Sequence, residues 1–242
     1  MIESIKIGII VAILGGVSSG IGGVVSSICK IKNKRYISIL QQITAGIMTG
    51  IVCFDMLPES FKIANVFFSI IGVIIGVYII YFLDKIINKV NSKNYNNKYI
   101  ISVIIMISMA FHNIIEGLAI GASFSYSISM GITIIIAIIL HDIPEGIVVG
   151  ISNNIAGKNR VKNIIDTTLS GAVTGIGAFL GRLAGNINEV FIGMSLCIAA
   201  GVMLYIIACE LIPDSYNNYS SKKVNISYIL GIIIGAVIVY IN

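Results

Sequence analysis

Charged side chains are scarce in this sequence. Only 11% of its 242 residues are Asp, Glu, Lys or Arg, while 57% are hydrophobic. An ordinary soluble domain carries about 25% charged residues. A soluble core of this size could not bury so much apolar material, whereas a bilayer can, at roughly 20 apolar residues per crossing helix. The composition therefore excludes an ordinary soluble domain and predicts an all-α integral membrane protein.

Several motifs are also missing. No CxxC pair occurs among the four cysteines, so we expect these to be small buried hydrophobic residues. No G-x-x-x-x-G-K loop is present, which weighs against an ATP-driven pump. The first apolar stretch follows only Lys6 and lacks the basic start of a signal peptide, so we expect it to be a membrane span.

Long apolar stretches fill most of the chain. Reading them as membrane helices predicts eight spans, each with ends uncertain by several residues. The predicted spans cover about residues 5–28, 36–60, 63–83, 99–123, 128–151, 164–186, 190–213 and 224–241.

The net charge of +5 comes from basic residues that fall in alternate connections between these spans. Since cytoplasmic loops carry the excess of Lys and Arg, this pattern predicts an even number of spans with both termini outside. Topology thus explains the basic residues better than a nucleic-acid partner does. The basic residues predicted inside are Lys30, Lys32, Lys34, Arg35, Lys85, Lys89, Lys93, Lys98, Lys158, Arg160, Lys162, Lys222 and Lys223.

The chain repeats itself. The segment AGIMTGIVCFDMLPES at 45–60 aligns without gaps to AGVMLYIIACELIPDS at 200–215, and FHNIIEGLAIG at 111–121 aligns to LHDIPEGIVVG at 140–150. Two spans separate the outer copies, so these copies run in opposite directions across the membrane. Inverted repeats are typical of secondary transporters with a midplane binding site.

We therefore expect one transporter domain over 1–242, in which inverted repeats of three spans flank a central pair, spans 4 and 5. The predicted parts are repeat unit 1 at about 5–83, the central helix pair at about 99–151 and repeat unit 2 at about 164–241.

Spans 4 and 5 each carry the word H-[ND]-x-x-E-G in apolar surroundings. Residues three and four apart in a helix share one face, so each word projects an imidazole, a carboxylate and a further oxygen donor together. An isolated acid at the bilayer centre costs about 2.5 kcal/mol or more, and a bound dication removes that cost. Proton binding is the alternative way to neutralise these acids. The candidate metal residues are His112, Asn113, Glu116, His141, Asp142 and Glu145.

Further acids recur at equivalent positions of the outer repeat. Asp55 matches Glu210, and we expect both along the pathway of the ion, with the stronger case for Glu210. Glu59 matches Asp214, and we expect these two at the outer and inner mouths respectively. All three prolines lie in the repeated words, and Pro144 is expected to bend span 5 beside His141.

Imidazole and carboxylate ligands without clustered thiolates suit zinc, iron(II), manganese and related dications such as cadmium, and argue against copper(I). The ligand set does not choose among these ions. One dication would leave carboxylates over, which indicates a second ion next to the first.

The paired H-[ND]-x-x-E-G words and the AGxM…[DE]xxP[ED]S words in spans 2 and 7 resemble the ZIP (Zrt-, Irt-like) family of metal transporters. The short loops resemble those of bacterial members. The resemblance implies a 3+2+3 arrangement of eight helices in the cell membrane, both termini outside, and metal movement into the cytoplasm. Homodimers are common in that family.

The resemblance also assigns ligands to two adjacent metal positions. Two positions depart from the family pattern. Ile115 stands where many members have proline, and His141 stands where some members have a residue other than histidine. The first position would use His112, Glu116, His141 and Glu145 with Met48 nearby, and the second Asn113, Asp142 and Glu210, with Glu116 and Glu145 as bridges.

Two other functions compete with metal transport. An intramembrane metal-dependent hydrolase needs an open metal position and a general base, but the word H-E-x-x-H is missing and the repeated sites are symmetric. An ion-coupled carrier of another solute would use the same acids as relays. Metal binding that depends on Glu145 would argue against such a carrier.

Overall fold

The computed structural model describes residues 1–29, 33–93, 98–185 and 189–241, and every regular element in these ranges is helical. Lys30 and Lys32, which the topology prediction uses, lie outside the described residues. The helices are α1 (Ile2–Cys29), α2 (Lys34–Ile51), η1 (Val52–Met56), α3 (Leu57–Lys93), α4 (Lys98–Tyr126), α5 (Ile128–Ile155), α6 (Arg160–Ala172), α7 (Thr174–Gly185), α8 (Glu189–Ile206), η2 (Ile207–Leu211), α9 (Ile212–Asn218) and α10 (Lys222–Ile241).

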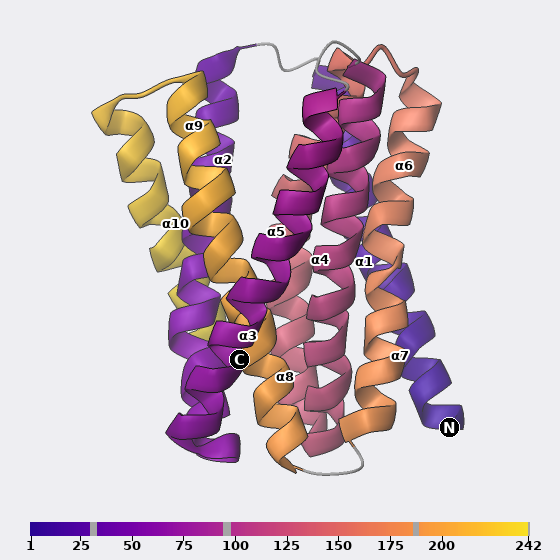
Figure 1. Ribbon diagram of the computed structural model, residues 1–242, viewed down its shortest axis with the longest axis vertical. Helices are drawn as coiled ribbons and strands as arrows, with labels where there is room; N and C mark the ends of the chain where they lie inside the picture. Colours follow the sequence, from indigo (N-terminus) through magenta and orange to yellow (C-terminus); the bar gives the residue numbers. More distant parts are fainter. Residues whose placement is uncertain (30–32, 94–97, 186–188, 242) are drawn as a thin grey trace.

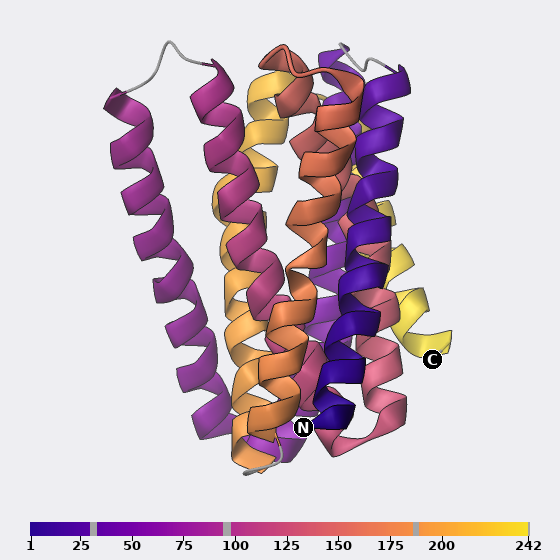
Figure 2. The ribbon, with the colours of Figure 1, turned by 90° about the vertical axis from the view of Figure 1, so that its right-hand side faces the viewer.

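Seven helical stretches within the described ranges are long and apolar enough to cross a membrane. The predicted spans 4 to 8 and span 1 each correspond to one of them. Predicted spans 2 and 3 fall together in one stretch, Lys34–Ile86, because α2, η1 and α3 follow each other without a loop. Inside α3, however, Asn65 has φ 62° and ψ 160°, which breaks the helix there. Figure 2 shows α3, in purple, as the outermost helix on the left.

Two short π-helical turns occupy equivalent positions of the sequence repeat. The N–H of Leu57 bonds to the carbonyl of Val52 at the end of η1, and the N–H of Ile212 bonds to that of Ile207 at the end of η2. Each turn is followed by a proline, Pro58 or Pro213, which cannot donate the usual backbone bond. The helix continues past both prolines, so neither ends a helix.

Packing contacts follow the same repeat. A side-chain carbon at Gly46 would overlap the backbone carbonyl of Tyr228, and one at Gly201 would overlap that of Val73. Residues 46 and 73 match 201 and 228 at the shift found in the sequence. α10 therefore packs on α2 as α3 packs on α8, with backbones close enough that only glycine fits.

Serine hydroxyls repeat the pattern. Ser60 donates to the carbonyl of Gly193 and Ser215 donates to that of Ser38, both at 3.1 Å. The internal repeat is thus visible in equivalent hydrogen bonds as well as in helix packing.

The helices form two groups according to these close contacts (Figure 1). All glycines with close neighbours contact only helices of their own group. We call α1, α4, α5, α6 and α7 bundle A. Bundle B consists of α2, α3, α8, α9 and α10, with the turns η1 and η2 that join them. The bundles meet mainly where α4 packs on α8 and α2 packs on α5.

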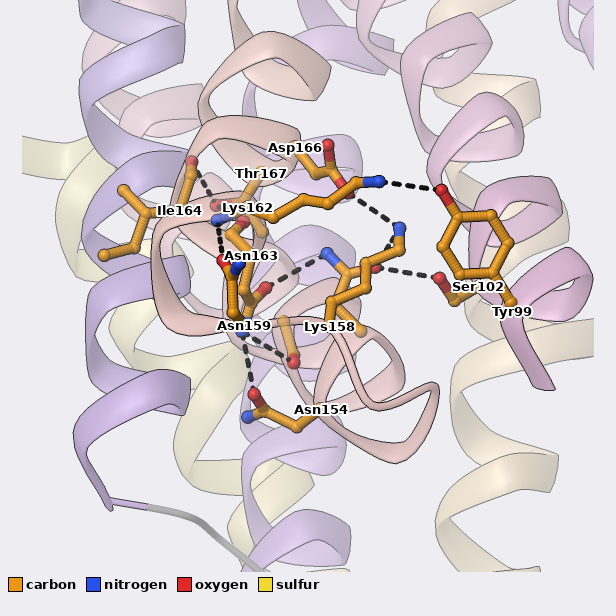
Figure 3. A network of polar contacts seen from close by, with 12 residues as sticks. Tyr99, Ser102, Asn154, Lys158, Asn159, Lys162, Asn163, Ile164, Asp166 and Thr167 are labelled. Atoms are coloured by element: carbon orange, nitrogen blue, oxygen red, sulfur yellow. Dashed lines mark hydrogen bonds and ion pairs between the residues drawn. The ribbon is translucent and has the colours of Figure 1, made fainter.

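A polar network closes bundle A at the turn between α5 and α6 (Figure 3). The buried Lys158 ammonium donates to Asp166 at 2.7 Å and to Asn153 at 2.8 Å. Asn153 also accepts from Ser102 of α4 and donates to Asn163 of α6. Asn163 in turn donates to α1 hydroxyls, so the network joins all four helices at one end.

Candidate metal site

The two H-[ND]-x-x-E-G motifs of α4 and α5 meet in the interior, as their helical spacing predicts. His112, Glu116, His141 and Glu145 are each at most 2% exposed. The Oε1 atom of Glu116 lies 3.0 Å from Nε2 of His112 and 2.9 Å from Nε2 of His141. Glu145 Oε1 lies 3.5 Å from Nε2 of His112. One glutamate therefore contacts both imidazoles, and the second glutamate lies beside that of His112.

Asn113 and Asp142 lie beside these four residues, and each forms a hydrogen bond to a helix outside the α4–α5 pair. The Nδ2 of Asn113 donates to the carbonyl of Ser170 on α6 at 2.8 Å. The hydroxyl of Ser18 on α1 donates to Oδ2 of Asp142 at 3.1 Å. The other carboxylate oxygen, Oδ1, lies 3.7 Å from Nε2 of His141.

Ser18 was not predicted from the sequence. Its counterpart in the repeat is the apolar Val173, so the repeat gave no signal for it.

The cluster holds many buried polar atoms without a hydrogen-bond partner. Leaving such a group unpaired costs about 1–3 kcal/mol, and more for a charged group. Atoms of this kind gathered in one place are ones that a single cation could satisfy together. They are Nδ1 of His112, Oδ1 of Asn113, Oε2 of Glu116, Nδ1 of His141, Oδ1 of Asp142 and both carboxylate oxygens of Glu145.

Two sets of ligand atoms within this cluster are compact enough to hold a metal ion. One set joins His112, His141 and Glu145, and the other joins Glu116, His141 and Asp142. The ligand atoms of each set lie within 4.8 Å of one another. The shared His141 places the two sets next to each other, and mixed imidazole and carboxylate ligands suit divalent transition metals.

The acids predicted along the pathway lie in the two π-helical turns. Asp55 of η1 is half-buried, and its Oδ2 has no partner. Glu210 of η2 is also half-buried and interacts electrostatically with His112 and Glu145. The structure thus brings Glu210 near the cluster.

The other predicted residues, Glu59, Asp214 and Met48, lie on helices other than α4 and α5. Glu59 pairs with the exposed Lys62 at 2.8 Å, and Asp214 is exposed in α9. Met48 is fully buried in α2, a helix that packs on α5. Its role as a ligand stays a prediction.

The prediction that the cysteines are buried was wrong for two of them. Cys197 is buried, but Cys53 and Cys209 are exposed. Both exposed residues lie in the π-helical turns next to the pathway acids, on the side of the helix that faces away from the core.

Long apolar helices around a buried cluster of imidazoles and carboxylates define a class, the polytopic membrane proteins that handle metal ions within the membrane. The family model described as ZIP Zinc transporter matches residues 89–242, well over half of the chain. The chain therefore belongs to the ZIP zinc transporter family, whose members transport divalent metal ions. Comparison with curated proteins finds no significant match.

The matched segment begins in the last residues of α3 and contains the whole histidine–carboxylate cluster. The segment before it, residues 1–88, is related to the matched part by the internal repeat.

Proposed function

We propose that this protein carries zinc, or a related divalent ion, through a pair of adjacent sites between α4 and α5. The first site uses His112, His141 and Glu145, and the second uses Asp142 with the oxygen of Asn113. Glu116 contacts both imidazoles and would bridge the two ions. The observation that carries the proposal is the set of unpartnered polar atoms that converge in this buried cluster.

We further propose that Lys34–Ile86 crosses the membrane twice, which makes eight spans in a 3+2+3 arrangement. A straight helix of its 53 residues would be about 80 Å long, whereas the hydrocarbon core is about 30 Å thick. The break at Asn65 provides the point of reversal. In both ribbon views the two ends of the chain lie toward the end of the molecule opposite the α5–α6 turn, which fits an even number of spans (Figures 1 and 2).

The basic α5–α6 turn, with Lys158, Arg160 and Lys162, then faces the cytoplasm under the positive-inside rule. Both termini then lie on the outer side of the cell membrane. Transport into the cytoplasm agrees with the family resemblance. Assembly as a homodimer stays a prediction.

Transport would proceed by movement of bundle A against bundle B. The six central ligands all belong to bundle A, whereas Asp55 and Glu210 belong to bundle B. Backbone contacts through glycine hold each bundle together, and no such contact joins the two bundles in the part of the chain that the structure describes. Sliding at this boundary would carry the ligands past the pathway acids without breaking the close packing inside either bundle.

Metal entry into proteoliposomes tests the proposal. Protein is reconstituted with a metal-sensitive dye inside, and zinc, iron(II), manganese and cadmium are offered outside, with and without a pH gradient. Glu145→Ala should abolish flux. Glu3→Ala is the matched control, because this acid is 79% exposed and remote from the cluster, and it should transport as the wild type does.

Two other outcomes would overturn the proposal. Metal-dependent cleavage of a peptide or lipid without flux would support the hydrolase reading. Proton flux without metal flux, from protein that binds no metal, would support an ion-coupled carrier of another solute.

A further inference from the structure

Ser18 of α1 reaches the candidate site from a helix that contributes no ligand. Its side chain is 1% exposed, and its hydroxyl oxygen lies 3.1 Å from Oδ2 of Asp142. The same oxygen lies 3.0 Å from the backbone carbonyl of Gly15, three residues earlier in α1. A serine hydroxyl carries a single hydrogen, so these two acceptors compete for it.

Close packing of α1 on α5 brings the hydroxyl within reach. A side-chain carbon at Gly22 would overlap the backbone carbonyl of Ile143, and one at Gly146 would overlap the carbonyl of Ser19. The two helix backbones are therefore in contact over the turn of α5 that follows Asp142. At that separation the short serine side chain spans the gap, and the geometry is set by backbone rather than by flexible side chains.

The bond to Asp142 leaves the carboxylate with one held oxygen and one free oxygen. Oδ2 accepts from Ser18, while the buried Oδ1 has no hydrogen-bond partner and lies on the side of His141. Asn113 is oriented in a similar way, because its Nδ2 donates to the backbone of α6 while Oδ1 stays without a partner. The side chains of Asp142 and Asn113 are thus each oriented by a hydrogen bond to a neighbouring helix of bundle A, α1 or α6.

We propose that Ser18 is a positioning residue that orients the Asp142 carboxylate for metal binding. Partners of this kind, which hold a ligand in place, typically contribute 10–100-fold to metal affinity. The carbonyl of Gly15 serves as the alternative acceptor, so the hydroxyl stays satisfied when the carboxylate turns toward a bound ion. This inference rests on the proposed function, because it needs a metal at Asp142.

Zinc binding to purified protein, measured by equilibrium dialysis, tests the inference. Ser18→Ala should weaken zinc binding by about 10–100-fold. Ser18→Cys keeps the volume but donates weakly, so its zinc affinity should lie between those of the wild type and Ser18→Ala. Ser26→Ala is the matched control, because Ser26 also donates to the carbonyl three residues back in α1, at 2.9 Å, but belongs to the polar network near the α5–α6 turn. It should leave zinc affinity unchanged.

A double-mutant cycle with Asp142→Ala separates positioning from a general structural effect. If Ser18 acts through Asp142, then Ser18→Ala should change zinc affinity less than about twofold once the carboxylate is gone. An equal loss in both backgrounds, or unchanged affinity in the single variant, overturns the inference and leaves the proposed function standing. Wild-type protein that binds no zinc overturns both. Should Ser18→Ala fail to fold, Ser18→Cys alone carries the same cycle.

Discussion

Replacing Glu145 by Gln should shift the stability of the protein in opposite directions with and without metal. Both carboxylate oxygens of Glu145 are buried without a hydrogen-bond partner, and the nearest imidazole nitrogen lies 3.5 Å away. A poorly compensated acid at membrane depth costs about 2.5 kcal/mol or more. The neutral amide should therefore stabilise the metal-free protein by about 2 kcal/mol, or roughly 4–8 °C in midpoint for a chain of this length.

Added zinc should have the opposite effect, because it should stabilise the wild type but not the Glu145→Gln variant. Zinc at about 100 times its dissociation constant stabilises the wild type by about 2.7 kcal/mol, which is roughly 5–10 °C. Glu145→Gln removes a ligand and should abolish that increase. Glu145→Gln should thus have the higher midpoint without metal, but its midpoint should not rise when zinc is added.

Far-ultraviolet circular dichroism during heating follows the midpoint, since the chain has no tryptophan to report by fluorescence. Glu3→Gln is the control, because its exposed ion pair with Arg182 contributes little and the zinc-dependent increase should remain. A lower midpoint for metal-free Glu145→Gln would show that the carboxylate is stabilising as it stands. That result would refute the argument from unpaired charge.

Three further predictions concern parts of the fold that support the site. Asn163→Ala removes several buried hydrogen bonds of the polar network and should cost about 2–4 kcal/mol, seen as a lower thermal midpoint; unchanged stability would contradict it. Gly117→Val would place side-chain atoms on the carbonyl of Thr174 and should prevent a monodisperse peak in size-exclusion chromatography, so normal folding would argue against the tight packing inside bundle A. Asp55→Asn and Glu210→Gln should each slow zinc flux in proteoliposomes at least severalfold while equilibrium zinc binding stays within about threefold, because both acids belong to bundle B; wild-type rates in both variants would remove them from the pathway.

Much of the site was accessible from the sequence. The spacing of His112 and Glu116, repeated in His141 and Glu145, places all four side chains on helix faces that must be buried together, because each is costly in lipid. The repeat also singled out Asp55 and Glu210 as equivalent acids along the predicted ion pathway. Both are half-buried in a π-helical turn.

Local features that depend on backbone geometry were not accessible in the same way. The sequence placed the boundary between the second and third spans near residues 61–62, several residues from the break at Asn65, but it did not predict that α2, η1 and α3 would follow each other without a loop. Cys53 and Cys209, which lie in the π-helical turns, are exposed, against the prediction of burial. A one-residue change in helical register rotates every following side chain, and composition carries no record of it.

The sequence by itself determined that this chain is a membrane helical protein with paired histidine–carboxylate words and an internal repeat, because hydrophobicity and helical spacing are properties of neighbouring residues. Only the tertiary structure decided that α3 packs on α8 while α10 packs on α2, and that Ser18 meets Asp142 across 124 residues of chain. Glycine-lined faces in an isoleucine-rich chain are chemically alike. Which faces meet is therefore settled by the fit of whole helices, and that fit brings the supporting hydroxyl to the site.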